Sequence, residues 1–239
     1  MTGAGIRYDT LNWSFCWRIA PVSVLPRRRL PAFGIRGTSF TWLPASMDHN
    51  ITVSGYYFEL RPVRLDDAAF MIGLRTDPEL ATYLNPTSGR LEDQRDYLEN
   101  YFSTPGDYYF IVQGKASGEP EGMLAVYDID QRSQSAEWGR WILRKDSLAA
   151  VESACLVYRV GLEELGMKEL YCRTVARNER VVSFHDSCGL VRARDLPGYV
   201  RINGVEHDSV EQVMNASIWP SCRQQMEARA RQIATLLNR

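Results

Sequence analysis

The sequence has 239 residues, of which 45% are hydrophobic, and its formal net charge at pH 7 is −1. This size and composition predict one sizeable core, with or without an extension. The near-neutral charge excludes the accumulated positive field typical of proteins that bind nucleic acids or anionic membranes, so a small molecule or a protein is the expected partner. No apolar run is long enough for a transmembrane helix.

The first 46 residues differ in composition from the rest of the chain. They include six arginines and one acidic residue but no lysine, and their apolar residues follow neither a helical nor a strand period. We interpret them as lying outside the fold: residues upstream of a natural start at Met47, a transit peptide or an ordered extension. The predicted division is an extension over 1–55 and a globular domain over 56–239 that ends in a helix.

Cysteine usage indicates a reducing compartment. The five cysteines form no CxxC pair, and none has a metal-ligand spacing from the three histidines. An odd number of scattered cysteines is typical of cytoplasmic proteins with free thiols, so we predict a cytoplasmic protein without a metal site. Cys188 is expected to be a buried thiol rather than a nucleophile, because the sequence places no activating histidine at a fixed geometry beside it.

Clear secondary-structure patterns begin at Tyr56. The segment YYFELRPV predicts a strand, and LDDAAFMIGLRTD predicts a helix with two aspartates in its first turn. A second helix is expected in SGRLEDQRDYLENYFS, with Ser88 as its cap. Three strands follow, DYYFIVQ, GMLAVYDID and SAEWGRWIL, and their succession favours an antiparallel meander.

The second half of the domain predicts a crossover. The apolar spacing in SLAAVESACLVYRVGLEELG predicts a helix that Ser147 caps and Gly166 ends, and KELYCRTV is a predicted strand. NERVVSFHDSCGL predicts a short helix closed by Gly189, followed by strands in GYVRING and SVEQVMNASIW and a terminal helix in CRQQMEARARQIATLLNR. A helix between two strands permits parallel pairing, so the predicted class is α+β with one βαβ-like crossover.

The junction WILRKDSLAA is a candidate phosphate site. A helix start presents unpaired N–H groups and a partial positive charge, and Arg144 and Lys145 add two cations beside it. Solvated basic residues in an ordinary loop are the alternative interpretation.

The order of elements over residues 57 to 219 resembles the GNAT superfamily of acetyl-CoA-dependent N-acetyltransferases. Three segments carry the resemblance: AEWGRWIL with its glutamate, RKDSLAA at the helix start, and NERVVSFHDSCGL, which is similar to the family's NERAxxFYEKLGF. The resemblance implies a GNAT acyl-CoA N-acyltransferase fold, with a central mixed, mostly antiparallel sheet flanked by helices. It also implies acetyl-CoA as the acyl donor and no metal.

The phosphate loop departs from the family pattern because it contains no glycine. The pattern R/Q-x-x-G-x-G/A aligns either on Arg144, Ser147 and Ala149 or on Lys145, Leu148 and Ala150. A glycine would let the backbone approach a pyrophosphate closely, so the substitution predicts weaker cofactor binding or another loop path. The full set of cofactor-binding residues implied by the resemblance is Ile142, Leu143, Arg144, Lys145, Ser147, Leu148, Ala149, Ala150 and Asn178.

The resemblance also implies catalytic roles. Glu137 would accept the ammonium proton, with a solvent-facing residue paired to Arg140 or Arg173 as the alternative. The Leu143 N–H would hold the thioester oxygen. His185 occupies the family's tyrosine position and would protonate the departing thiolate, its ordinary pKa lying near neutrality; a hydrogen-bonded histidine on a half-buried helix face is the alternative. Asn178 would cap its helix and contact the pantetheine arm.

Within the superfamily, histidine in FHDSCGL resembles the PseH-type enzymes that acetylate the 4-amino group of a nucleotide-linked amino-dideoxy sugar. A neighbouring resemblance is to RimJ/RimL-type enzymes, which acetylate protein N-termini. The missing glycines leave open a third hypothesis, a non-catalytic acyl-CoA-binding relative. An amino-sugar nucleotide is the favoured substrate, and a homodimer is one assembly that the resemblance allows.

Overall fold

The computed structural model describes residues 49–238, so the segment before His49, with the proposed start at Met47, lies outside the described residues. One eight-stranded sheet organises this part of the chain, in the order β1-β2-β3-β4-β5-β6-β8-β7. The strands are β1 (Val53–Ser54), β2 (Phe58–Pro62), β3 (Tyr108–Gly114), β4 (Pro120–Asp130), β5 (Ser135–Leu143), β6 (Glu169–Val175), β7 (Val191–Ile202) and β8 (Val205–Asn215). The helices are η1 (Leu65–Asp67), α1 (Ala68–Thr76), α2 (Leu91–Phe102), α3 (Ala150–Arg159), the π-helical turn η2 (Val160–Glu164), α4 (Glu179–Ser187) and α5 (Trp219–Leu237).

The sheet is mixed and mostly antiparallel, as predicted. Strands β3, β4 and β5 form the expected meander, and β5 and β6, which flank α3, pair in parallel. The α+β class and the βαβ-like crossover are therefore confirmed.

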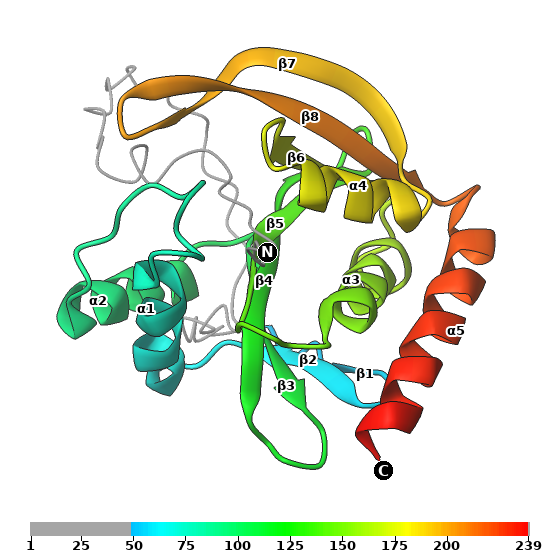
Figure 1. Ribbon diagram of the computed structural model, residues 1–239, viewed down its shortest axis with the longest axis horizontal. Coiled ribbons are helices and arrows are strands. Elements are labelled where there is room, and N and C mark those ends of the chain that lie inside the picture. Colours follow the sequence, from blue (N-terminus) through cyan, green and yellow to red (C-terminus); the bar gives the residue numbers. More distant parts are fainter. Residues whose placement is uncertain (1–48, 239) are drawn as a thin grey trace, which may run out of the picture.

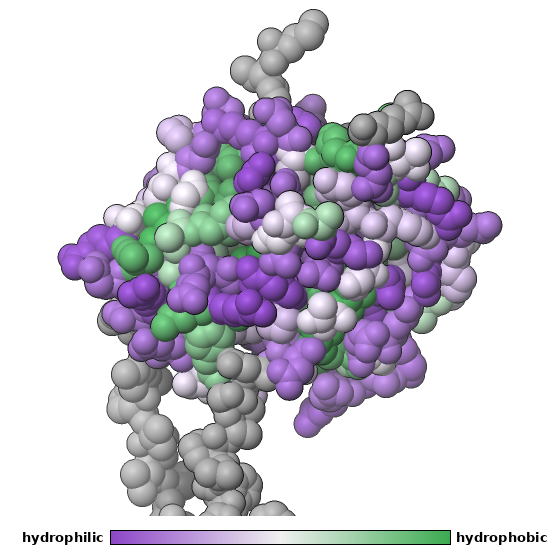
Figure 2. All heavy atoms as spheres, turned by 90° about the horizontal axis from the view of Figure 1, so that it is seen from below, coloured by the Kyte–Doolittle hydropathy of each residue, from purple (hydrophilic) through white to green (hydrophobic). Residues whose placement is uncertain are grey.

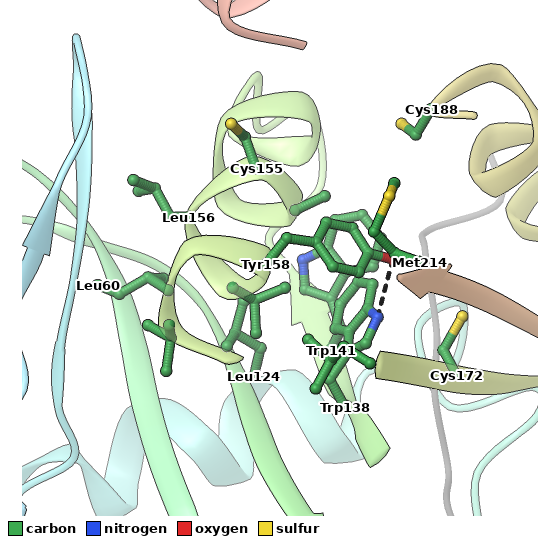
Figure 3. Close-up of a cluster of buried hydrophobic side chains, with 14 of the residues drawn as sticks. Leu60, Leu124, Trp138, Trp141, Cys155, Leu156, Tyr158, Cys172, Cys188 and Met214 are labelled. Atoms are coloured by element: carbon green, nitrogen blue, oxygen red, sulfur yellow. Dashed lines mark hydrogen bonds between the residues drawn. The ribbon is translucent and has the colours of Figure 1, made fainter. Parts of the chain in front are cut away.

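Two apolar cores lie on opposite faces of the sheet. Helices α1 and α2 cover one face, and α3, α4 and α5 cover the other (Figure 1). Alternate residues of a strand point to opposite faces, so β5 contributes Ile142 to the first core and Trp138, Trp141 and Leu143 to the second. In the second core the Trp138 indole N–H donates to the Tyr158 hydroxyl at 2.9 Å (Figure 3).

The four cysteines of the described residues are free and buried: Cys155, Cys172, Cys188 and Cys222. Figure 3 shows three of them around the aromatic core. Burial raises the pKa of the Cys188 thiol to about 11, so it is a thiol rather than a thiolate at neutral pH. The prediction that Cys188 is a buried thiol is confirmed.

A β-bulge interrupts β5 where it passes β4. Ala125 pairs with Gly139 and Met123 with Ile142, so Leu124 faces two residues, Arg140 and Trp141. Arg140 has φ of +51°, in the left-handed region that non-glycine residues rarely adopt. An ion pair with Asp107 at 2.6 Å and stacking over the Tyr127 ring, 4.6 Å from its centroid, hold this conformation.

Several predicted boundaries need correction. Strand β1 pairs with β2, so the domain starts before residue 56. Helix α2 starts at Leu91 rather than directly after Ser88, whose hydroxyl instead accepts the Arg90 N–H. Strand β7 starts seven residues earlier than GYVRING, because β8 pairs with all of this segment across bulges. The end of SVEQVMNASIW forms a turn and the first residue of α5 rather than strand.

The surface is largely polar on the face shown in Figure 2, where hydrophobic residues form small separate patches. Among residues 49–238, no helix is both long enough and apolar enough to cross a membrane.

Candidate active site

Strands β5 and β6 separate shortly after they meet. Their parallel register includes only three pairs, the last of which joins Glu137 and Tyr171. Beyond this point β6 continues to Val175 beside β8, while β5 continues to Leu143 beside β4. Beyond Glu137 and Tyr171, β5 and β6 are therefore no longer paired with each other.

Glu137 lies at this point and is buried, with 1% of its surface exposed. Tyr127, directly opposite on β4, donates its hydroxyl to Glu137 Oε1 at 3.1 Å. Arg173, two residues beyond Tyr171 on β6, donates Nη1 to Glu137 Oε2 at 2.6 Å. The carboxylate thus has a partner on each oxygen, and the alternative of a solvent-facing glutamate is wrong, although the predicted pairing with Arg173 is present.

Burial raises the pKa of the Glu137 carboxyl to about 7, even though the Arg173 guanidinium and the Tyr127 hydroxyl favour the ionised form. A carboxyl that titrates near neutral pH can both accept and release a proton under working conditions. This is the property that a general base requires.

Arg173 is held from four sides. Its Nε donates to Glu211 on β8 at 2.8 Å, in addition to its bond to Glu137. Its guanidinium carbon lies 4.7 Å from the Tyr171 ring centroid and 5.1 Å from that of Tyr199. Two carboxylates at its edges and two rings near its faces leave this cation little freedom.

His185 lies on the other face of the sheet, on α4, and is completely buried. Its ring is perpendicular to Trp138, with centroids 5.4 Å apart, and is 5.9 Å from Trp141. Burial lowers the pKa of His185 to about 3, so the imidazole is neutral at working pH. The expectation of a histidine that titrates near neutrality is therefore wrong, because the apolar core penalises the charged form; the predicted contact with the sulfur stays a prediction.

Leu143 and Ile142 end β5 beside the separation. The Arg144 N–H donates to the Glu121 carbonyl on β4 at 2.8 Å. Because successive N–H groups along a strand point to opposite edges, the Leu143 N–H points away from β4, toward the side from which β6 has departed. This orientation is the one that its predicted role requires. The Ile142 side chain instead lies in the core beneath α1 and α2.

The two cations of the phosphate loop are engaged by carboxylates. Lys145 lies 3.1 Å from Asp77 and 3.3 Å from Glu79, both of which follow α1, and Arg144 lies 3.6 Å from Glu121. Arg144 and Lys145 also line a surface hollow beside α1. Neither cation is simply solvated, and a phosphate at this loop would compete with these carboxylates for them.

The loop turns without a glycine because Asp146 has φ of +61°. Helix α3 then begins at Ala150, later than a cap at Ser147 predicts, and the Ser147 hydroxyl accepts the Ala149 N–H at 3.3 Å. Ala149 is buried against the core, whereas the Leu148 side chain is 48% exposed. The helix start thus presents an apolar side chain, Leu148, to solvent.

Asn178 occupies the N-cap position of α4 but its side chain makes no capping hydrogen bond, so the predicted cap is only positional. The residue is 3% exposed, and within the described part of the chain its Nδ2 donor has no hydrogen-bond partner. The same holds for the Thr174 hydroxyl at the end of β6. Buried polar groups are normally satisfied, so these two atoms near the strand separation fit a polar ligand.

The sequence reasoning named Arg173 as a possible partner of Glu137 but missed Tyr127. Register places Tyr127 and Tyr171 on either side of Glu137, and Arg173 and Arg194 on either side of Glu211. Alternating arginine and glutamate on strands is a signal for cross-strand ion pairs. Which of these residues pair depends on the strand order β6-β8-β7, and this order does not follow from the sequence alone.

The fold agrees with a family model. The model described as "Acetyltransferase (GNAT) domain" matches residues 58–191, more than half of the chain. The chain therefore belongs to the GNAT acetyltransferases. It is an acetyl-CoA-dependent N-acetyltransferase, which confirms the family and enzyme class predicted from the motifs.

Solved structures extend this result, whereas a search of curated proteins found no match. The chain is 28% identical to apo FdhC, a nucleotide-linked sugar GNAT, with a TM-score of 0.63 over 76% of this chain and 98% of that chain. A variant of the spermidine N-acetyltransferase SpeG from Vibrio cholerae is 17% identical, with a TM-score of 0.60 over 68% of this chain and 96% of that chain. At that identity the second comparison supports the fold alone.

Proposed function

We propose that this enzyme acetylates the amino group of a nucleotide-linked amino-dideoxy sugar, at its 4-amino position, with Glu137 as the general base. One observation carries the assignment of the base: a buried carboxylate with a pKa near neutrality lies where β5 and β6 separate. The similarity to a nucleotide-linked sugar GNAT supports the acceptor class.

In this proposal the residues around Glu137 activate the amine. The carboxylate takes a proton from the ammonium form, directly or through one water, and so exposes the nitrogen lone pair. Arg173 and Tyr127 hold the two carboxylate oxygens, so the base keeps one orientation during the transfer.

Bound acetyl-CoA would supply an activated acetyl thioester. The Leu143 N–H would stabilise the negative charge that develops on the carbonyl oxygen. The loop Arg144–Ala150 would hold the phosphates, Asn178 would meet the pantetheine arm with its free amide donor, and Leu148 would offer an exposed apolar contact. His185 would donate a hydrogen bond from its neutral ring N–H to the departing thiolate, which then takes its proton from water.

Charge around the proposed base argues against a polyamine acceptor. A polycation binds best to carboxylates that no cation of the protein already neutralises. Of the four acidic residues around this site, three form ion pairs with arginines: Glu137 and Glu211 with Arg173 and Arg194, and Asp107 with Arg140. Asp128 is the fourth acidic residue. The half-buried tyrosines at positions 171 and 199 add aromatic surface of the kind that sugar rings pack against. Both features favour a neutral or anionic acceptor.

Release of free CoA thiol from acetyl-CoA, measured across a panel of amines, tests the acceptor. The panel contains 4-amino-dideoxy sugar nucleotides, peptides with free N-termini and spermidine. Turnover with sugar nucleotides supports the proposal. Turnover with peptides alone would move the enzyme to the RimJ/RimL-like group, and calorimetry that detects no acetyl-CoA binding would indicate a non-catalytic relative.

Replacing His185 with alanine is expected to lower kcat about tenfold, the effect of losing one hydrogen bond to a charged group, without moving the pH–rate profile between pH 5 and 8. The profile should stay in place because His185 does not titrate in this range. Phe184→Leu, at the adjacent aromatic side chain, controls for altered packing. A limb near pH 6.5 that disappears in the alanine variant would instead show an imidazolium donor, and an unchanged rate would remove His185 from the mechanism.

The double replacement Asp77→Asn with Glu79→Gln is expected to strengthen acetyl-CoA binding two- to fivefold at low salt. Both substitutions free Lys145 for the phosphates, and exposed ion pairs of this kind are individually weak. Calorimetry at low and high ionic strength measures the change, which salt should reduce. Glu92→Gln, an exposed carboxylate on α2, is the control. Equal or weaker binding by the double variant at low salt would contradict this role of Lys145.

A further inference from the structure

Glu211 lies on β8, in the register position opposite Arg173 on β6 and Arg194 on β7. Its carboxylate accepts the Arg173 Nε at 2.8 Å, and it accepts Arg194 Nε and Nη2 at 2.7 and 3.0 Å. Glu211 is 5% exposed, so these bonds form in a water-poor environment. An alternating row of charges therefore runs across four strands, from Glu137 on β5 to Arg173 on β6, Glu211 on β8 and Arg194 on β7.

The row has one inner end and one outer end. Glu137 at the inner end is buried, whereas the Arg194 side chain at the outer end is 59% exposed. Arg173 is shared between two carboxylates, so its positive charge is divided between Glu137 and Glu211. A change in charge at Glu211 or Arg194 therefore changes the net electrostatic effect of the row on the Glu137 carboxyl.

We propose that Glu211 is a positioning residue for acetyl transfer, which holds Arg173 against Glu137 and balances part of its charge. This inference rests on the proposed role of Glu137 as the base. Glu211 has no contact with Glu137 and acts through Arg173, which is itself confined between the rings of Tyr171 and Tyr199.

Other charged and titratable groups on the strands around Glu137 either lie near its carboxylate or contact the residues that connect to it. They are Tyr127 and Asp128 of β4, Arg140 of β5, Tyr171 and Arg173 of β6, Arg194 and Tyr199 of β7, and Glu211 of β8. Only Glu211 is bonded to both Arg173 and Arg194 among these residues. Replacing Glu211 and replacing Arg194 should therefore shift the pKa of Glu137 in opposite directions.

Measuring kcat/KM against pH in two charge-removing variants tests this inference. Glu211→Gln keeps an oxygen for hydrogen bonding but removes the negative charge, so Arg173 acts more strongly on Glu137. The acid limb of the profile should move down by roughly half a unit to one unit, and the plateau should fall about three- to tenfold because the base is weaker. Arg194→Gln removes the outer positive charge and should move the limb up.

Glu206→Gln is the matched control, since Glu206 lies exposed on the same strand and outside the row. A general loss of packing cannot shift the acid limb in opposite directions in the two variants. If Glu211→Gln does not fold, Arg194→Gln alone provides the test. A limb that stays in place in both variants overturns the inference. Different results would contradict the proposed function itself: no turnover by the wild type, or a Glu137→Gln variant that keeps the wild-type rate and the acid limb of its pH profile.

Discussion

Replacement of Glu137 by glutamine is expected to lower kcat by about 10²–10⁴-fold, the usual contribution of general acid–base catalysis. Glutamine keeps the shape of the side chain and an oxygen that can accept the Arg173 N–H, but it cannot take a proton from the amine. The acid limb of the pH–rate profile near pH 7 should disappear with the carboxyl. Free-thiol release over pH 5 to 9 measures both effects.

The binding of acetyl-CoA should not change in this variant, because Glu137 is not among the residues proposed to hold the cofactor. Glu169→Gln is a suitable control: Glu169 lies on the neighbouring strand β6, is half-buried, and is not part of the charged row. A kcat within threefold of wild type in Glu137→Gln would exclude this residue as the base.

The same substitution is expected to stabilise the folded protein at alkaline pH relative to wild type. The folded-state pKa of Glu137, about 7, lies above its ordinary value of 4.5, so folding favours the protonated carboxyl. The stability that this group contributes is fully present below pH 4.5 and is lost as the pH rises through 7. A shift of this size corresponds to about 3 kcal/mol, and glutamine, which does not titrate, avoids the loss.

Urea denaturation of wild type and Glu137→Gln at pH 5 and pH 8 measures this effect. The difference in free energy of unfolding between the two proteins should move in favour of the variant by about 1–3 kcal/mol at the higher pH. The Glu169→Gln control should show no such trend. A difference that is equal at both pH values would mean that Glu137 has an ordinary pKa in the folded protein. Together, the two experiments would show that this carboxylate is retained for catalysis at a cost in stability.

Much of the fold could be predicted because its signals are local. The predicted strand SAEWGRWIL matches β5 from first residue to last, and Gly166 and Gly189 end helices with φ of +67° and +86°, as predicted. The errors lie in segments whose secondary structure depends on tertiary contacts. Strand β7 contains a proline and few β-branched residues, so its first half shows little strand propensity; pairing with β8 makes it a strand.

For the candidate site, single residues were more accessible to sequence reasoning than their environments. Glu137 and His185 were predicted as catalytic residues from motifs, and these roles stay predictions; what the motifs could not show is that burial raises the pKa of the Glu137 carboxyl to about 7 and lowers that of His185 to about 3. Such shifts depend on what packs around a group, and in this protein those neighbours come from strands and helices distant in sequence. The ion pairs of Lys145 were equally hidden, since Asp77 and Glu79 precede it by more than sixty residues.

The bulge in β5 explains why Trp138 and Trp141, three residues apart, face the same side of a strand. Arg140 is the extra residue, and without it the strand would alternate regularly with every apolar side chain on its present face. The bulge thus amounts to a one-residue insertion that adds a cation beside Asp107 and Tyr127 while leaving the core arrangement unchanged. In evolutionary terms, one face of such a strand can gain or lose a charged group by a single insertion or deletion, at a point where the hydrophobic core does not have to be rebuilt.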